Sequence, residues 1–233
     1  MNEPQDRRGV ILASAAELFA RKGIGASTVR ELADEVGMLS GSLYHHFESK
    51  DAIVAEILTG YLRAIQSRYA AVLASGKGPA ESLHDLVLTS LQVASEQPQA
   101  TAIYQNELQY LRERQRFADV LAGAADIQRT WLLVIEKGVA EGSFRSDIAP
   151  RVFYRLIRDA VWLSVHWHHP AGEYPTSQLA EDITAVFLDG FAARPRLGRD
   201  LPWLRCRLTC GDDVPSSRVP VHALGIHAGG TRQ

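Results

Sequence analysis

The residues of this 233-residue chain best suited to binding a small molecule are an arginine and a tryptophan four positions apart. Arg158 and Trp162 lie in the segment RVFYRLIRDAVWLSVHW, and a helix would bring side chains at this spacing to the same face. A guanidinium beside an indole can bind a phosphate or carboxylate and also stack on a flat ring system. The neighbouring Asp159 is expected to point about 100° away around the helix axis, so it need not neutralise Arg158. This pattern predicts a site for an anionic ligand that carries a planar group.

A structural explanation of the same residues is also open. Arg158 could form an ion pair with Glu107, Glu136 or Glu141 while Trp162 packs in the core. Polar residues also interrupt an apolar helix further upstream, where they would either line a ligand site or simply pack. The candidate ligand contacts in that segment are Tyr104, Gln105, Glu107, Leu108 and Leu111.

No group of residues in the sequence predicts a metal site, a cofactor or catalysis. His166, His168 and His169 do not share one helical face, and no acidic or cysteine partner is near them. Cys206 and Cys210 are loosely spaced from the histidines that follow, and their flanks lack the apolar pattern of a zinc finger. The segment SGKGP lacks the spacing of a phosphate-binding loop, and no nucleophile has a partner base. We therefore expect a protein that is not an enzyme and holds no cofactor.

The composition places the chain among soluble globular proteins. Hydrophobic residues make up 46% and charged residues 22%, and the formal net charge is −2. No apolar run reaches the ~18 residues of a membrane span. The N-terminus MNEPQDRRG is polar where a secretory signal would be hydrophobic. These features predict a cytoplasmic protein with no membrane partner.

Short helices are predicted at the N-terminus. Apolar residues recur at helical spacing over residues 6–22, and the two glycines that follow end this helix. A second helix begins at Thr28, whose spacing to Glu31 is that of a capping box. Gly37 supplies the positive φ that a sharp turn needs after this helix.

A third short helix, SGSLYHHF, is expected after this turn, with Ser40 as its cap and with Leu43 and Phe47 facing inward. Two short helices joined by a glycine-containing turn of about three residues form a helix-turn-helix unit, whose second helix enters the major groove of DNA. The serines and the tyrosine of this segment can bond phosphate oxygens or base edges.

Residues 27–50, STVRELADEVGMLSGSLYHHFESK, resemble the DNA-binding motif of the TetR family of bacterial regulators. The matching positions include Thr28, Gly37, the run LYHHF and Lys50. The resemblance implies a homodimeric repressor that binds a pseudo-palindromic operator in double-stranded DNA. It also implies phosphate contacts from Thr28, Tyr44 and Lys50, with Ser40, Gly41, Ser42 and His45 facing the groove.

The charge of this region partly opposes a DNA-binding role. Residues 1–60 hold six Lys and Arg against nine Asp and Glu, a net charge of −3, whereas a non-specific DNA-binding protein would be basic. A dimer that binds a specific sequence needs positive charge only at the groove. The alternative is a helical bundle without a nucleic-acid role.

From residue 50 onward the chain is predicted to form a larger helical domain. Helical spacing interrupted by glycine and proline predicts an all-α fold. The expected helices cover residues 50–74, 80–95, 100–114, 119–141, 150–168 and 176–193. We expect a three-helix DNA-binding domain over residues 1–50, with the helix-turn-helix at 28–47. An effector-binding and dimerisation domain over residues 51–196 and a disordered tail over residues 197–233 would follow.

The last two predicted helices are apolar over so much of their surface that each must be buried on more than one side. A four-helix dimer interface would bury them, as the resemblance to the TetR family also implies. The alternative is a purely intramolecular core. The residues expected at the interface are Phe153, Ile157, Val161, Ile183, Val186, Phe187 and Phe191.

The resemblance extends over most of the chain, from about Arg7 to Phe191. The segments LSGSLYHHFESKDAIVAEILTGYL, AIYQNELQYL and YRLIRDAVWLSVHWHHPAGEYP are similar to one TetR branch, the actinobacterial repressors of late cholesterol degradation. This similarity implies release from the operator by the CoA thioester of a steroid-ring-derived propanoate, with its phosphates and adenine at Arg158 and Trp162. Two alternatives stay open: a TetR-type regulator of another lipid, acyl-CoA or drug response, and an acyl-CoA-binding module without a DNA role.

Overall fold

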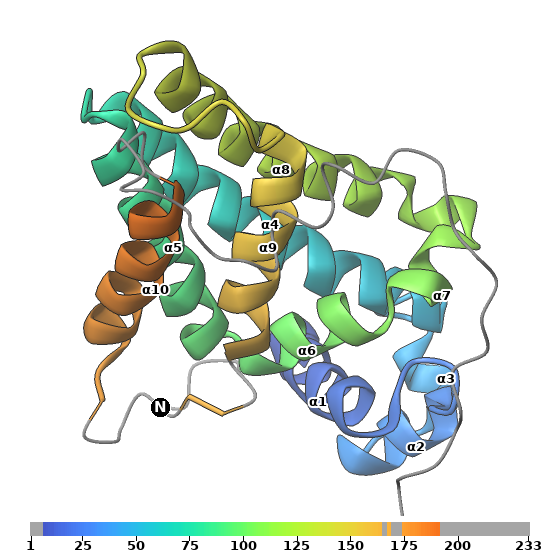
Figure 1. Ribbon diagram of the computed structural model, residues 1–233. Coiled ribbons are helices and arrows are strands. Elements are labelled where there is room, and N and C mark those ends of the chain that lie inside the picture. Colours follow the sequence, from blue (N-terminus) through green and yellow to red (C-terminus); the bar gives the residue numbers. More distant parts are fainter. Residues whose placement is uncertain (1–6, 165–166, 169–173, 192–233) are drawn as a thin grey trace, which may run out of the picture. The chain divides into compact units, whose positions relative to one another are not determined.

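The structure, a computed structural model, describes residues 7–164, 167–168 and 174–191, which form helices joined by turns (Figure 1). The all-α fold expected from the sequence is confirmed. The helices are α1 (Arg7–Lys22), α2 (Val29–Glu35), α3 (Ser40–Leu43), α4 (Lys50–Ala74), α5 (Pro79–Glu96), α6 (Pro98–Asn106), α7 (Leu108–Arg112), the 3₁₀ turn η1 (Gln115–Phe117), α8 (Ala118–Ala140), α9 (Pro150–Leu163) and α10 (Thr176–Phe191). The tail expected over residues 197–233 lies outside the described residues. No helix within the described ranges is long and apolar enough to cross a membrane.

The start of α2 and the turn after it form as the sequence predicts. Thr28 Oγ1 accepts a hydrogen bond from the Glu31 backbone N–H, and the Glu31 carboxylate accepts one from the Thr28 backbone N–H. This capping box satisfies backbone donors at the helix start. Gly37 has a φ of +64°, which only glycine adopts at little cost, and the chain turns there toward α3.

The third helix differs from the prediction at both ends. Its N-cap residue is Leu39, not Ser40, and no side chain caps it. The helix ends at Leu43 and does not continue to Phe47, because the N–H groups of His45 and His46 bond to carbonyls three residues back instead of four. Leu43 and Phe47 are nevertheless buried, as the spacing predicts.

The long helix α4 connects the N-terminal helices to the rest of the protein. It packs against α1 at its beginning and against α5 and α8 further along. Near its end, the buried Tyr69 hydroxyl accepts a hydrogen bond from Trp131 Nε1 of α8 at 3.0 Å. The two aromatic rings meet edge to face at a centroid distance of 6.3 Å. α4 therefore belongs to the cores of both parts of the protein.

Two predicted helices are shorter in the structure. The helix expected over residues 100–114 is broken at Glu107, whose φ of −109° and ψ of 17° are not helical, so that α6 and α7 are separate. The helix expected over residues 150–168 ends at Leu163. The connection before that helix is tight, because the Phe144 ring lies against Gly138 of α8. A Cβ atom at Gly138 would fall 2.2 Å from a ring carbon of Phe144.

The side of α9 expected to face a dimer partner is buried inside the protomer. Phe153, Ile157 and Val161 belong to the core, so the prediction that they contact a partner is wrong. The Phe153 ring meets the Phe187 ring of α10 edge to face, with 5.6 Å between centroids. Because α9 is apolar on more than one side, the spacing alone did not show which side the core would take.

Other apolar side chains of the last two helices remain exposed. Val186 of α10 is 72% exposed, as an interface residue would be in the isolated chain, and Ile183 and Phe187 are half-buried. The side chain of Phe191 lies outside the described residues. On α9 the exposed apolar side chains are Val152, Leu156 and Leu163.

Candidate nucleic-acid interface and ligand cavity

The helix-turn-helix presents most of the predicted DNA contacts at the surface. Thr28, Gly41, Tyr44 and His45 are exposed, and Ser40 and Ser42 are half-buried. A Cβ atom built on Gly41 would meet no other atom within 4 Å, so the space in front of α3 is open. Small side chains at the start of α3 allow it to approach another surface closely, as a helix in the major groove must.

Lys50, for which a phosphate contact is predicted, holds the loop that precedes α2. Its Nζ donates hydrogen bonds to the carbonyl oxygens of Ile24 at 2.6 Å and Ser27 at 2.8 Å. Burial lowers the pKa of the Lys50 ammonium below its usual value. Lys50 therefore helps to position the helix-turn-helix by fixing the loop between α1 and α2.

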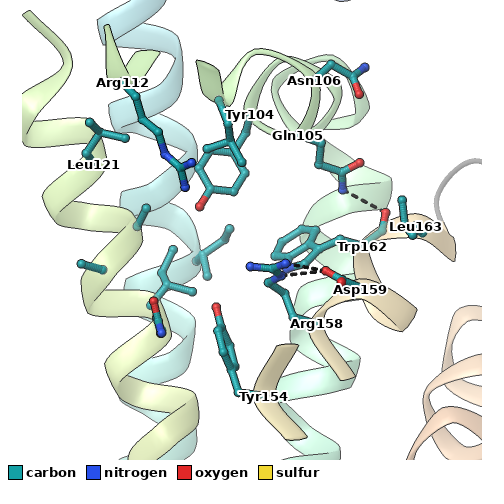
Figure 2. A pocket seen from close by; sticks show the side chains of 16 residues that line it. Tyr104, Gln105, Asn106, Arg112, Leu121, Tyr154, Arg158, Asp159, Trp162 and Leu163 are labelled. Carbon is teal, nitrogen blue, oxygen red and sulfur yellow. Dashed lines mark hydrogen bonds and ion pairs between the residues drawn. The ribbon is translucent and has the colours of Figure 1, made fainter. Parts of the chain in front are cut away.

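A cavity of about 600 Å³ lies between α4, α6, α7, α8 and α9 (Figure 2). The wall formed by α4 and α8 is largely apolar, whereas α6, α7 and α9 supply most of the polar side chains. Most of the residues predicted to contact a ligand line this one cavity: Tyr104, Gln105, Leu108, Arg158 and Trp162. Glu107 and Leu111, also named as candidates, are not among the lining residues.

Arg158 lines the cavity, but its neighbour Asp159 does not point away from it. Arg158 Nε and Nη2 donate hydrogen bonds to Asp159 Oδ1 at 2.9 and 2.6 Å (Figure 2). The expectation that Asp159 points away from Arg158 is therefore wrong, because two half-exposed side chains can bend toward each other from adjacent positions. Arg158 pairs with this aspartate and not with any of the three glutamates considered from the sequence.

The cavity residues that were not predicted include Tyr154 and Arg112. Tyr154 lies four positions before Arg158 on α9, so the same helical spacing could have identified it. Arg112 comes from α7, and Figure 2 shows its guanidinium close to Tyr104. Among the described residues, no carboxylate lies within ion-pair distance of Arg112. Burial raises the pKa of Tyr154 to about 12 and also raises the pKa of Tyr104, so both hydroxyls stay protonated at neutral pH.

Gln105 links α6 to the end of α9 and leaves an acceptor unused. Its Nε2 donates a hydrogen bond to the Trp162 carbonyl oxygen at 2.9 Å. Its Oε1 is buried and has no hydrogen-bond partner within the described part of the chain. A buried acceptor of this kind is costly unless something donates to it. The charged residues of the lining are Arg112, Arg158 and Asp159, a net of +1, which favours an anion.

Glu107 joins the cavity wall to the helix-turn-helix. Its neighbours Asn106 and Leu108 line the cavity, whereas Glu107 Oε1 accepts a hydrogen bond from the backbone N–H of Ile24 at 3.2 Å. The Ile24 carbonyl is bonded to Lys50, so both polar backbone groups of this loop residue are held by side chains. Two more contacts join the segment after Glu107 to residues around the start of α4. The Tyr110 hydroxyl donates a hydrogen bond to Asp51, and Arg116 forms an ion pair with Glu48.

Two family models match the chain. The model described as bacterial regulatory proteins, tetR family, matches residues 11–57, and the model described as tetracyclin repressor-like, C-terminal domain, matches residues 76–191. The match of the first model spans the helix-turn-helix, and that of the second spans most of the cavity.

Similar proteins agree with these matches. The HTH-type transcriptional repressor KstR2 of Rhodococcus jostii (strain RHA1) is 41% identical over 187 residues, which cover 80% of this chain and 92% of that protein. KstR2 of Mycobacterium tuberculosis is 39% identical over 184 residues, covering 79% and 92%. The solved structure of the ketosteroid transcriptional regulator KstR2 of Mycobacterium tuberculosis superposes with a TM-score of 0.75 at 37% identity, covering 82% of this chain and 98% of that one.

Proposed function

This chain belongs to the TetR family and is a DNA-binding transcriptional repressor related to KstR2, and on that premise we propose that it represses genes of steroid-ring catabolism until an acyl-CoA thioester binds. TetR-family proteins are regulators and not enzymes. Membership of this family argues against the alternative of an acyl-CoA-binding module that does not bind DNA. The observation that carries the proposal is the cavity, which combines two guanidiniums, aromatic rings and an apolar wall.

The helix-turn-helix would contact the operator through α3. Exposed hydroxyls of Thr28 and Tyr44 are suited to phosphate oxygens, whereas Ser40, Ser42 and His45 are suited to base edges. In a twofold dimer the two copies of α3 would enter successive major grooves about 34 Å apart. This geometry matches a pseudo-palindromic operator.

The dimer would form through the outward faces of α9 and α10. Val152, Leu156 and Leu163 on α9 and Val186 on α10 are exposed in the single protomer. Exposed apolar residues grouped on neighbouring helices are typical of an interface. A twofold contact would cover each of these side chains with the same surface of the second copy.

The ligand would lie with its apolar part inside and its anionic part at the rim. A volume of about 600 Å³ is within the usual range of ligand pockets, and its apolar wall suits fused alicyclic rings. Arg112 and Arg158 would bind phosphates of the CoA head, and the adenine would stack on Trp162. The solved relative is described as a ketosteroid transcriptional regulator, which supports a steroid-derived ligand for this chain.

Release from DNA would follow from the contact between Glu107 and Ile24. A ligand that displaces the break between α6 and α7 moves the carboxylate that holds the loop before α2. A ligand can shift the protein only by binding one arrangement better than the other. The ligand would therefore favour the arrangement in which the two copies of α3 no longer fit one operator.

The experiment is a fluorescence-anisotropy titration of the full chain against the DNA upstream of its own gene. The added compounds are the CoA thioester of a steroid-ring propanoate, the free propanoate, free CoA and a straight-chain acyl-CoA. We expect release by the first compound only. Failure to bind any upstream duplex would contradict operator binding there, and retention of DNA with all four compounds would contradict the effector. Release by the straight-chain thioester would favour a regulator of another lipid response.

A further inference from the structure

Leu39 occupies an unusual place at the start of α3. It is the N-cap residue of that helix, with an extended backbone at φ −73° and ψ 140°, and its side chain is 80% exposed. Leu43 and Phe47, four and eight positions later, are buried. The spacing therefore predicts that Leu39 joins them in the core, but the extended backbone turns its side chain outward.

Both features of Leu39 are unfavourable for the folded protein alone. Helix N-caps favour serine, threonine, aspartate or asparagine because their side chains accept a hydrogen bond from the first turn, and α3 has no such bond. A leucine side chain in water also forgoes the burial that its neighbours Leu43 and Phe47 achieve. Positions that break a local rule without a structural gain are where functional contacts are expected.

The surroundings of Leu39 indicate which contact this is. The residues at the beginning of a recognition helix are those that touch base edges in the major groove. Ser40, Gly41 and Ser42 follow directly, and the space in front of Gly41 is open. In the major groove, thymine is distinguished by its C5-methyl group, which apolar side chains contact.

We propose that Leu39 is a specificity-determining residue that packs against the C5-methyl group of a thymine in each operator half-site. The proposal rests on the DNA-binding function of α3. It adds an apolar contact to the polar ones expected from Ser40, Ser42 and His45. An apolar residue at this position gives sequence preference without a hydrogen bond.

The test uses a duplex that the full wild-type chain enriches from a random-sequence pool. Each thymine is replaced in turn by deoxyuridine, which removes only the methyl group, and the dissociation constant is measured for the wild type and for Leu39→Ala. At one thymine per half-site, we expect the replacement to weaken wild-type binding roughly fourfold, the factor for one buried methyl group. The same replacement should leave Leu39→Ala binding unchanged, because the partner of the methyl is already absent.

Two further variants keep the result interpretable. Leu73→Ala removes another exposed leucine, at the far end of α4, and should keep the full sensitivity to deoxyuridine. Leu39→Ser restores a capping side chain, so its melting temperature should equal or exceed that of the wild type while the thymine preference is lost. Equal sensitivity of the wild type and Leu39→Ala at every thymine would overturn the proposal. Failure of the pool to enrich any duplex would overturn DNA recognition itself, and the proposal with it.

Discussion

The carboxylate of Glu107, a residue flanked by the walls of the ligand cavity, accepts a hydrogen bond from the backbone N–H of Ile24 in the loop before α2. The two residues are 83 positions apart in the chain. Glu107 also occupies the only non-helical position between α6 and α7. A movement of the cavity wall at Glu107 would therefore act directly on the loop that precedes α2 of the helix-turn-helix.

Glu107→Ala should reduce the effect of the acyl-CoA on operator binding. One lost hydrogen bond of about 1 kcal/mol corresponds to roughly a fivefold smaller ratio between the operator dissociation constants with and without ligand. Glu107→Gln keeps an acceptor oxygen and should retain most of the coupling. Anisotropy titrations with and without the thioester measure the ratio, and an unchanged ratio in the alanine variant would contradict this role of Glu107.

Arg158→Met should abolish the ligand response while operator binding persists. The substitution removes a guanidinium that lines the cavity and leaves α3 untouched. Arg112→Met should have the same effect if the anionic group spans both arginines. Isothermal titration with the thioester, together with a DNA-binding control, checks both variants. Normal ligand affinity in Arg158→Met would exclude it as an anion contact.

Asp159→Asn should tighten ligand binding. Asp159 accepts hydrogen bonds from Nε and Nη2 of Arg158, so it would compete with the proposed anionic ligand for this guanidinium. Half-exposed ion pairs contribute up to about 1 kcal/mol, so a gain of up to roughly fivefold in affinity is expected. Glu136→Gln, a carboxylate of α8 outside this cavity, is the matched control for a general change of charge. Weaker binding by Asp159→Asn would show that the carboxylate supports the site.

Leu156→Asp should convert the dimer to monomers and weaken operator binding by at least about tenfold, because only one half-site is then held. Leu133 of α8 is as exposed as Leu156, at 56%, so Leu133→Asp is the control that should stay dimeric. Phe153→Ala should instead lower the free energy of unfolding by about 3–5 kcal/mol, because Phe153 is a core residue. Light scattering coupled to gel filtration gives the oligomeric state, and a dimeric Leu156→Asp would place the interface elsewhere.

The capping box of α2 should make the helix-turn-helix sensitive to acid. The hydrogen bond from the Lys22 side chain, followed by those from Thr28, lowers the pKa of Glu31 from 4.5 to about 2. A lowered pKa in the folded state stabilises the protein fully above pH 4.5, and this contribution is lost as the pH falls toward 2.

Glu31→Gln is the variant that isolates this effect, because glutamine can still complete the capping box but does not titrate. The wild-type melting temperature should fall more steeply than that of the variant between pH 4.5 and about 2. Circular dichroism melts over this range measure the difference. Parallel curves for the two proteins would show that Glu31 keeps an ordinary pKa.

The parts of the fold that local chemistry determines could be predicted from the sequence. The capping box at Thr28 and the positive φ of Gly37 depend on residues within a few positions of each other. The break at Glu107 could not be predicted, because no glycine or proline marks it. A contact with Ile24 accompanies the break, and only the tertiary fold brings that residue near.

The cavity could be predicted only in part for the same reason. Arg158 and Trp162 share one face of one helix, so their spacing was enough. Arg112 enters from another helix, and its place depends on how α7 packs. The pairing of Arg158 with Asp159 depends on side-chain rotamers, which an ideal helix projection does not include. Which apolar side of α9 is buried depends on its neighbours.

The contact between Gly138 and the Phe144 ring restricts which side chains position 138 can hold. A change to alanine adds one methyl group, and that methyl would overlap the ring. The ring would then leave its place, and with it the connection that leads into α9, the helix that carries Arg158 and Trp162. A position that touches neither operator nor ligand therefore bears on where the two cavity residues of α9 are placed.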